Sequence, residues 1–332
     1  MDMLQITDLH KRFGDKQVLK GLTLSVPEHS IYGFIGQNGA GKTTTMKIIL
    51  GLLQADAGEI MVAGEKVSYG QTATNRHIGY LPDVPEYYTF MTASEYLTFC
   101  GEICGMKKSE IKSRSEELLT LVGLREETHR IKGFSRGMKQ RLGIAQALLN
   151  KPKLLICDEP TSALDPVGRK EILDILMAVK EQTTVLFSTH ILSDVERICT
   201  DVAFLKDGII TMKGPLSQIR SQYRREEYLL ETENEADLHR LLRCIAAFRQ
   251  TTPTGYTSPT ENISTTGNIL ATDNISATDD SFRTHTNQLT FRETEIALSD
   301  VLRLLADQQI PILKLQRLEP TLESLFMEVA AK

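Results

Sequence analysis

The sequence predicts an α/β fold with a mostly parallel central sheet, and two apolar patterns carry this prediction. The first is an apolar strand, Ile31 to Ile35, that runs into a glycine-rich loop and then a helix from Thr43 to Leu53. The second is a pair of apolar runs at 154–157 and 184–188, with a helix from Gly168 to Lys180 between them. Strand, helix and strand in this order form a crossover between parallel strands, which are apolar throughout because both of their faces are buried.

The segments on either side of the first apolar strand follow a different pattern. Apolar and polar residues alternate from 22 to 26, and Gly14-Asp15 supplies a hairpin turn. Residues 57–67 repeat this pattern around Ala63-Gly64. Alternation with a period of two is typical of strands that bury one face. We therefore expect an antiparallel β layer beside the parallel sheet.

The loop after the first apolar strand reads Gly36-Gln37-Asn38-Gly39-Ala40-Gly41-Lys42-Thr43-Thr44, a complete G-x-x-x-x-G-K-T phosphate-binding motif. Its glycines let successive backbone N–H groups point at a β-phosphate, and the positive end of the following helix faces the same anion. Lys42 can bridge the β- and γ-phosphates, and the Thr43 hydroxyl can ligate Mg²⁺. A glycine-rich turn before a core helix would not explain Lys42-Thr43. All nine residues are therefore candidate nucleotide contacts in a P-loop NTPase core.

The chain becomes helical in character after the second β segment. Thr92-Ala93-Ser94-Glu95 matches a capping box, in which the threonine and glutamate side chains bind free N–H groups at the start of a helix. Apolar residues follow at helical spacing through Leu97, Cys100 and 111–121. The sequence therefore predicts a helical insertion at about 85–150.

Two carboxylates follow the apolar run at 154–157. Asp158, at the end of the strand, can hold the Mg²⁺ shell together with Thr43, and Glu159 can accept a proton from an attacking water. A solvent-facing acidic turn is the alternative interpretation, but the phosphate loop upstream favours a catalytic one. We therefore expect a nucleoside triphosphate and Mg²⁺ at this site, with Asp158 as a metal ligand and Glu159 as a catalytic residue.

Composition and sequence pattern argue against a nucleic-acid-binding protein, a membrane-spanning or secreted protein, and a cysteine metal site. The chain has 332 residues, a net charge of −5 and no dense Lys/Arg tract, so we do not expect nucleic acid as a partner. No apolar run approaches the ~20 residues that span a bilayer, and residues 1–9 lack a secretory signal pattern. The five cysteines have no metal-ligand spacing and favour reduced thiols.

The residues beyond about 222 differ in kind from those before. Apolar patterns at 228–230, 236–248, 295–306 and 310–318 predict a small α+β accessory domain, which we place at 223–332. The stretch 251–290 between them is rich in Thr, Ser and Asn. Its low hydrophobicity does not offset the entropy of ordering it, so we predict a disordered insertion there.

Three further motifs narrow the family. Phe134-Ser135-Arg136-Gly137-Met138-Lys139-Gln140 precedes the helix that leads to Asp158, Ser162-Ala163-Leu164-Asp165 follows the acidic pair, and His190 follows the next strand. Together with the phosphate loop, they resemble the ATP-binding subunit of an ABC transporter from residue 1 to about 222. The resemblance implies an ABC-type ATPase domain at 1–222 that dimerises around two ATP molecules with a second copy or a related subunit.

The resemblance also implies roles for the residues of these motifs. Ser135 and Gly137 would bind the γ-phosphate of the nucleotide held by the partner subunit. Asp165 would lie in the loop that runs along the subunit interface. His190 would be a second catalytic residue, in contact with the γ-phosphate and the attacking water. Phe13 would stack on adenine.

Three positions depart from the usual pattern of the family. Asp83 stands in the loop 81–85 where the family usually has glutamine, and it can still accept a water bound to Mg²⁺, with a shorter reach. Arg136 stands where glycine is usual, and Met138 where glutamine is usual. We retain Asp83 as a nucleotide-site residue.

The tail refines the functional interpretation. Residues 313–329, with Glu319 to Phe326 at their centre, are similar to the carboxy-terminal segment of ATPase subunits in bacterial drug, peptide and lipid exporters, including the bacitracin-resistance type. The resemblance implies a multi-span membrane permease as partner and a position on the cytoplasmic face of the cell membrane. Two alternatives are a soluble ABC-type ATPase that acts on DNA or ribosomes, which would show coiled-coil arms or tandem cassettes, and a P-loop kinase or GTPase, which would leave His190 unexplained.

Overall fold

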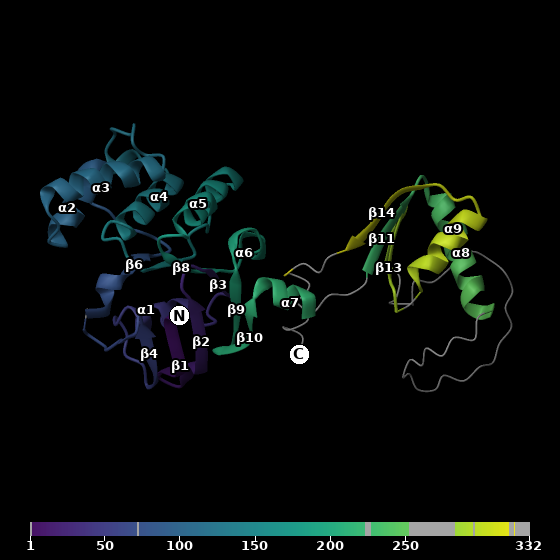
Figure 1. Cartoon of the computed structure of the whole chain (residues 1–332), viewed down its shortest axis with the longest axis horizontal. Helices are drawn as coiled ribbons and strands as arrows, with labels where there is room; N and C mark the ends of the chain where they lie inside the picture. The colour runs from purple at the N-terminus through teal and green to yellow at the C-terminus, as the bar shows by residue number, and fades with distance from the viewer. Residues whose placement is uncertain are drawn as a thin grey trace. The chain divides into compact units, whose positions relative to one another are not determined.

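The chain folds into two compact units (Figure 1). The first unit holds the described residues up to 222 together with Leu322, and the second holds those from 227 to 318. The computed structural model describes residues 2–71, 73–222, 227–251, 283–294, 296–318 and 322.

A six-stranded sheet in the order β10-β9-β3-β8-β7-β6 forms the centre of the first unit. The strands from β9 to β6 are parallel, and β10 pairs antiparallel with β9. Every residue of β3, β7 and β8 is buried, as expected for strands covered on both faces. The mostly parallel sheet is thus confirmed. Its strands are β3 Ile31–Gly36, β6 Ile78–Leu81, β7 Leu154–Asp158, β8 Thr184–Thr189, β9 Asp201–Lys206 and β10 Ile209–Pro215.

An antiparallel sheet in the order β2-β1-β4-β5 packs against the central sheet, which confirms the predicted β layer. Leu4, Leu22 and Val62 share one buried cluster with Met46 of helix α1 and Phe34 of β3. In Figure 1, α1, β1, β2 and β4 lie below the strands β3 and β8 of the central sheet, and α4 and α5 lie above these strands. The strands are β1 Asp2–Phe13, β2 Lys16–Pro27, β4 Ala57–Val62 and β5 Glu65–Lys66.

Helix α1 (Lys42–Ile49) is shorter than predicted. We expected it to reach Leu53, but Leu50 caps it and Gly51 follows with a φ of +68°. A left-handed glycine is a common way to end a helix, and it turns the chain towards β4.

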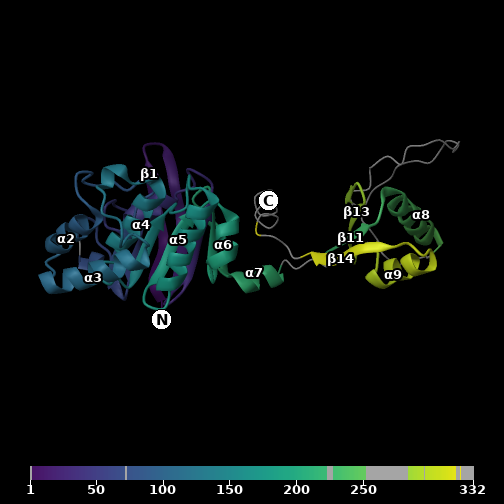
Figure 2. The same cartoon turned by 90° about the horizontal axis from the view of Figure 1, so that it is seen from above.

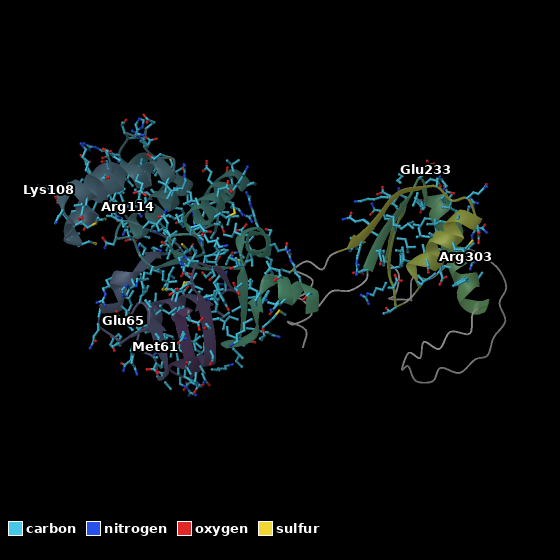
Figure 3. All side chains as sticks on the ribbon, viewed as in Figure 1. Met61, Glu65, Lys108, Arg114, Glu233 and Arg303 are labelled. Carbon is cyan, nitrogen blue, oxygen red and sulfur yellow. The ribbon has the colours of Figure 1, made fainter. Side chains whose placement is uncertain are left out.

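Helices α2, α3 and α4 follow β6 and precede β7 in the chain. Thr92 and Glu95 form the predicted capping box at the start of α2, with each side chain bound to the other residue's N–H. Arg114 of α3, labelled in Figure 3, donates to the carbonyl of Leu148 at 3.1 Å and so ties α3 to the end of α4. The remaining helical bounds of the first unit are α2 Ala93–Ile103, α3 Lys108–Leu121, α4 Arg136–Ala147, α5 Pro166–Val179, α6 Leu192–Ile198 and α7 Leu216–Gln222, with short 3₁₀ turns at Ala73–His77 and Ile131–Gly133.

The second unit has the element order β11-α8-β12-β13-α9-β14 and one antiparallel sheet in the order β12-β13-β11-β14. This is the order of the ferredoxin-like, split β-α-β arrangement. Figure 2 shows α8 and α9 on one face of the sheet, where Leu241, Val301 and Phe291 are buried together. The bounds are β11 Glu227–Thr232, α8 Glu235–Thr251, β12 Arg283–His285, β13 Gln288–Arg292, α9 Leu298–Asp307 and β14 Ile312–Leu318.

Two predictions about the C-terminal part were wrong in part. We predicted disorder throughout 251–290, but Thr251 ends α8 and residues 283–290 contribute β12 and most of β13. The reason is the alternation of Leu289 and Phe291, which places both side chains in the core of the second unit. Residues 252–282, which carry the rest of this prediction, lie outside the described residues.

The boundary of the accessory domain was the second error. We assigned all of 223–332 to it, but Leu322 belongs to the first unit. Its side chain is fully buried, and its N–H donates to the Glu196 carboxylate of α6 at 2.7 Å. Residues 319–321 and 323–332, which carry most of the exporter-like tail motif, lie outside the described residues.

Candidate nucleotide-binding site

The loop between β3 and α1 has a backbone that requires glycine at two positions. Gly41 has a φ of +114°, and a Cβ there would lie 2.8 Å from the Leu19 side chain. A Cβ at Gly36 would lie 2.6 Å from the carbonyl oxygen of Leu205. No side chain caps the start of α1, so its first N–H groups can bind an anion.

Lys42 is the first residue of α1, directly after this loop, and only 6% of its side chain is exposed. Its Nζ donates to the Gly36 carbonyl at 2.6 Å and lies 3.0 Å from Glu159 Oε1. A buried ammonium needs such partners, because desolvation without them is costly. A bound triphosphate would offer the same ammonium a more strongly charged partner.

Thr43, Asp158 and Ser188 form a hydrogen-bonded row at the ends of α1, β7 and β8. The Thr43 hydroxyl donates to Asp158 Oδ2 at 2.7 Å, and the Ser188 hydroxyl donates to Asp158 Oδ1 at 2.6 Å. Within the described residues no group of three or more His, Cys, Asp or Glu side chains could hold a metal ion. A hydroxyl and one carboxylate fit Mg²⁺ that takes its other ligands from phosphates and water.

Glu159 is held in an unusual backbone conformation with a φ of +48°. This left-handed region costs roughly 1–2 kcal/mol for a residue with a Cβ. Its N–H compensates by donating to Ser188, whose hydroxyl lies at 3.0 Å. The carboxylate is fixed from both sides, because His190 Nδ1 lies 2.9 Å from Oε2 while Lys42 lies beside Oε1.

These groups face a cavity of about 430 Å³. Phe13, with 48% of its surface exposed, lines one side, and Lys11 Nζ lies 5.3 Å from its ring centroid. Asp83 lines another part of the cavity, and burial raises the pKa of its carboxyl while the Arg136 guanidinium opposes that shift. The full lining is Phe13, Val18, Gln37, Asn38, Gly39, Gly41, Lys42, Thr43, Thr44, Asp83, Asp158 and Glu159.

Comparison with known proteins agrees with this geometry. Residues 19–162 match a family model described as ABC transporter. Over 236 residues the chain is 44% identical to the uncharacterized ABC transporter ATP-binding protein YxlF of Bacillus subtilis, covering 71% of this chain and 78% of that protein. The chain belongs to the ABC transporter ATP-binding protein family. Members of this family hydrolyse ATP, so the chain is an ATPase.

Two further proteins are similar to this ABC ATPase. It is 39% identical over 238 residues to the bacitracin transport ATP-binding protein BcrA of Bacillus licheniformis, covering 70% of this chain and 77% of that protein. A solved structure described as the ATP-binding subunit of an ABC transporter superposes with a TM-score of 0.60 and 34% identity, covering 67% of this chain and 93% of its own. Within the described residues, no helix of the ABC ATPase is both long and apolar enough to span a bilayer.

Three predicted site residues do not line the cavity of their own subunit. Ser135 caps α4, where its hydroxyl accepts from the Met138 N–H at 3.2 Å, and Asp165 caps α5, where its carboxylate accepts from the Gly168 N–H at 3.0 Å. Gly137 lies in the first turn of α4 with open space around it, since a Cβ there would meet no atom closer than 3.9 Å.

Three other predicted residues lie next to the cavity and do not line it. Gly36 holds Lys42 and His190 holds Glu159, as described above. Ala40 lines a neighbouring cavity between β2 and the β9–β10 turn.

Sequence reasoning missed several residues that hold the site together. Ser188 stands opposite Asp158 in the parallel register, and a small polar residue at the end of an apolar strand is a signal that could have identified it. Buried Asp194 of α6 accepts from Thr161 at 2.7 Å and from Arg169 at 2.6 Å, and so fixes the segment after Glu159. No local pattern in the sequence marks Asp194.

Proposed function

We propose that this ABC ATPase powers export of a drug, peptide or lipid through a separate membrane permease. The single observation that carries the catalytic part is the placement of the Glu159 carboxylate between Lys42 and His190, beside the Thr43–Asp158 pair. The similarity to the bacitracin transport protein BcrA supports the export part.

The residues of the site divide the work of hydrolysis among them. Lys42 and the N–H groups of the loop bind the phosphates of ATP, and Thr43 and Asp158 hold Mg²⁺, which when bound neutralises phosphate charge. Glu159 accepts the proton of the attacking water. His190 keeps the carboxylate of Glu159 oriented, and Phe13 offers its exposed ring to adenine.

The shared-site arrangement is part of the proposal. Ser135, Gly137 and Asp165 lie outside the cavity of their own subunit, which supports a role at the nucleotide held by a second copy or a related subunit. ATP binding would then favour a closed dimer, and hydrolysis would release it.

A surface beside the site suits a permease. Val84, Tyr88 and Phe90 are exposed in the segment between Asp83 and α2, and the Tyr88 ring packs edge-on against Phe99 with centroids 5.4 Å apart. Exposed apolar side chains that gather in one segment favour a protein contact. We place the permease on this segment, and the subunit therefore on the cytoplasmic face of the membrane.

Affinity purification of the full chain from detergent-solubilised membranes of its own organism tests this function. A multi-span membrane protein should co-purify, and substitution of Tyr88 and Phe90 by serine should abolish the association without changing the thermal midpoint. Co-purification with ribosomes or DNA and with no membrane protein would favour the soluble ABC-type ATPase instead.

A further inference from the structure

Two residues that depart from the family pattern, Asp83 and Arg136, are partners in the structure. Arg136 Nη2 lies 3.6 Å from Asp83 Oδ1, and the two side chains are 46% and 47% exposed. The Oδ1 atom itself is shielded from solvent and accepts no hydrogen bond from the part of the chain that the structure describes. The guanidinium therefore supplies the nearby charge that this oxygen needs.

The pair joins the nucleotide cavity to the start of α4. Asp83 lines the cavity, and its carbonyl accepts from Gln140 Nε2 at 2.8 Å. Arg136 is the first residue of α4, a 12-residue helix, and follows the Ser135 cap directly. The guanidinium is thus held beside the helix end that we propose to meet the nucleotide of a second subunit.

Charge decides which partner Arg136 prefers. A guanidinium has a planar fork of donors that fits phosphate oxygens in a bidentate manner, and a triphosphate carries several negative charges where Asp83 carries one. The positive end of the α4 helix dipole, next to Arg136, favours the same anion. A half-exposed ion pair such as Asp83–Arg136 is weak enough to exchange.

We propose that Arg136 binds the phosphates of the nucleotide held by a second copy of the chain, and that Asp83 retains its guanidinium in the single subunit. This inference rests on the shared site of the proposed function. In this proposal Arg136 binds the nucleotide of the other subunit. Asp83, in the same chain as Arg136, competes with that nucleotide for the guanidinium.

The test measures the ATP concentration that gives half-maximal dimer on size-exclusion chromatography, in the full chain carrying Glu159→Gln. Arg136→Ala should raise this concentration about tenfold or more, as expected for loss of a charge-assisted hydrogen bond, and Arg136→Lys should fall between. Asp83→Asn should lower it about two- to fivefold, since the competing carboxylate is gone. The double variant should behave like Arg136→Ala alone.

Two matched substitutions control for the loss of charge. Lys132→Ala removes an exposed cation just before α4, and Asp174→Asn removes the carboxylate of a comparably exposed pair with Arg197 in α5 and α6. Neither should shift the dimerisation midpoint. If Asp83→Asn acts equally with and without Arg136, or if Arg136→Ala matches Lys132→Ala, the proposal is wrong.

A mixing experiment separates action in trans from action in cis. Chains with Lys42→Ala are mixed with chains with Arg136→Ala, both carrying Glu159→Gln. The mixed dimer has one site with both Lys42 and Arg136 intact, so it should form at ATP concentrations where neither variant dimerises alone, with one ATP bound per dimer. No gain on mixing would overturn the role in trans. If the chain with Glu159→Gln alone never dimerises with ATP, the shared-site model fails before this inference is reached.

Discussion

We propose that the Glu159 carboxylate serves two purposes at different stages. It neutralises the buried Lys42 ammonium, which lies 3.0 Å from Oε1, and its Oε2 lies 2.9 Å from His190 Nδ1. A γ-phosphate drawn to Lys42 would replace Glu159 as the ammonium's partner. The carboxylate would then be free to accept a proton while His190 still orients it.

Lys42→Ala tests the phosphate loop. We expect the affinity for ATP to fall at least tenfold, because a charge-assisted contact to phosphate is worth about 1.5–3 kcal/mol. Binding of a fluorescent ATP analogue measures this. Lys47→Ala, which removes an exposed cation from the same helix, is the control and should bind normally. Equal affinity in the two variants would refute the assignment of the loop.

Glu159→Gln tests the catalytic base. The amide keeps the shape of the side chain but cannot accept the proton, so ATP turnover should slow by about 10² or more. Steady-state release of phosphate gives the rate, and size-exclusion chromatography with Mg-ATP should show a dimer. Exposed Glu181→Gln should retain the normal rate. Turnover above a tenth of normal in Glu159→Gln would assign the base elsewhere.

Ser188→Ala tests the hydrogen-bonded row at the metal site. The substitution leaves a buried Asp158 oxygen without its donor and should lower the free energy of unfolding by about 1–3 kcal/mol. Chemical denaturation measures the loss. Ser221→Ala removes an exposed hydroxyl bonded to the Gln218 carbonyl and should cost much less. Similar costs for both would mean that the row is not structurally important.

Sequence motifs predicted the residues that line the cavity except Val18, because the residues of each motif lie within a few positions of one another. They did not reveal that Asp83 and Arg136 would pair, since 53 positions separate them (136 − 83) and only the packing of α4 beside the end of β6 brings them close. The role of Ser188 was not predicted for a similar reason. Its role depends on the register of β7 with β8, which no local pattern specifies.

At the scale of elements, α4 is fixed against the segment that carries Asp83. The Tyr87 hydroxyl donates to the Lys139 carbonyl at 2.5 Å, and Gly143 lets Leu81 and Tyr87 approach the helix closely. We therefore expect a change in the segment after β6 to be transmitted to α4 through these packed side chains.

Gly143→Ala tests this close packing. Its Cβ would lie 2.4 Å from Leu81 Cδ1 and 2.8 Å from the Tyr87 hydroxyl, so we expect a loss of about 1–3 kcal/mol in the free energy of unfolding. Gly137→Ala in the same helix has open space and should be stabilising by up to about 1 kcal/mol, because alanine favours helix. Denaturant unfolding of both variants measures the contrast. Equal effects would show that α4 is not tightly packed at Gly143.

The sequence predicted helices and strands correctly where a strong local pattern marked them. It failed to predict short strands that follow a polar stretch. The parallel strands and the capping box at Thr92 were clear because each has a strong local signal. Strands β12 and β13 were missed because the composition of 251–290 as a whole concealed the alternation at Leu289 and Phe291.

At the scale of the whole molecule, the chain leaves the first unit after residue 222 and returns to it at Leu322. The second unit is thus inserted within the sequence of the first. This return was not predictable, since within the described residues the buried Leu322 side chain and its backbone hydrogen bond to Glu196 carry it, and neither produces a pattern in the sequence.

The second unit has its own core, to which Leu289 and Phe291 of β13 contribute. We therefore expect a replacement of residues 252–282 alone to affect stability differently from one that extends into the strands after them. Replacing 252–282 by a short Gly-Ser link should leave the thermal midpoint and the ATPase rate unchanged, because each doubling of loop length alters the closure free energy by only about 0.6 kcal/mol. A replacement that extends through residue 290 also removes buried Leu289 and most of the hairpin, and should destabilise the second unit by several kcal/mol. Differential scanning calorimetry of both variants distinguishes the two effects. Unfolding of the shorter deletion would show that 252–282 packs into a core, and tolerance of the longer one would mean that β13 contributes nothing to stability.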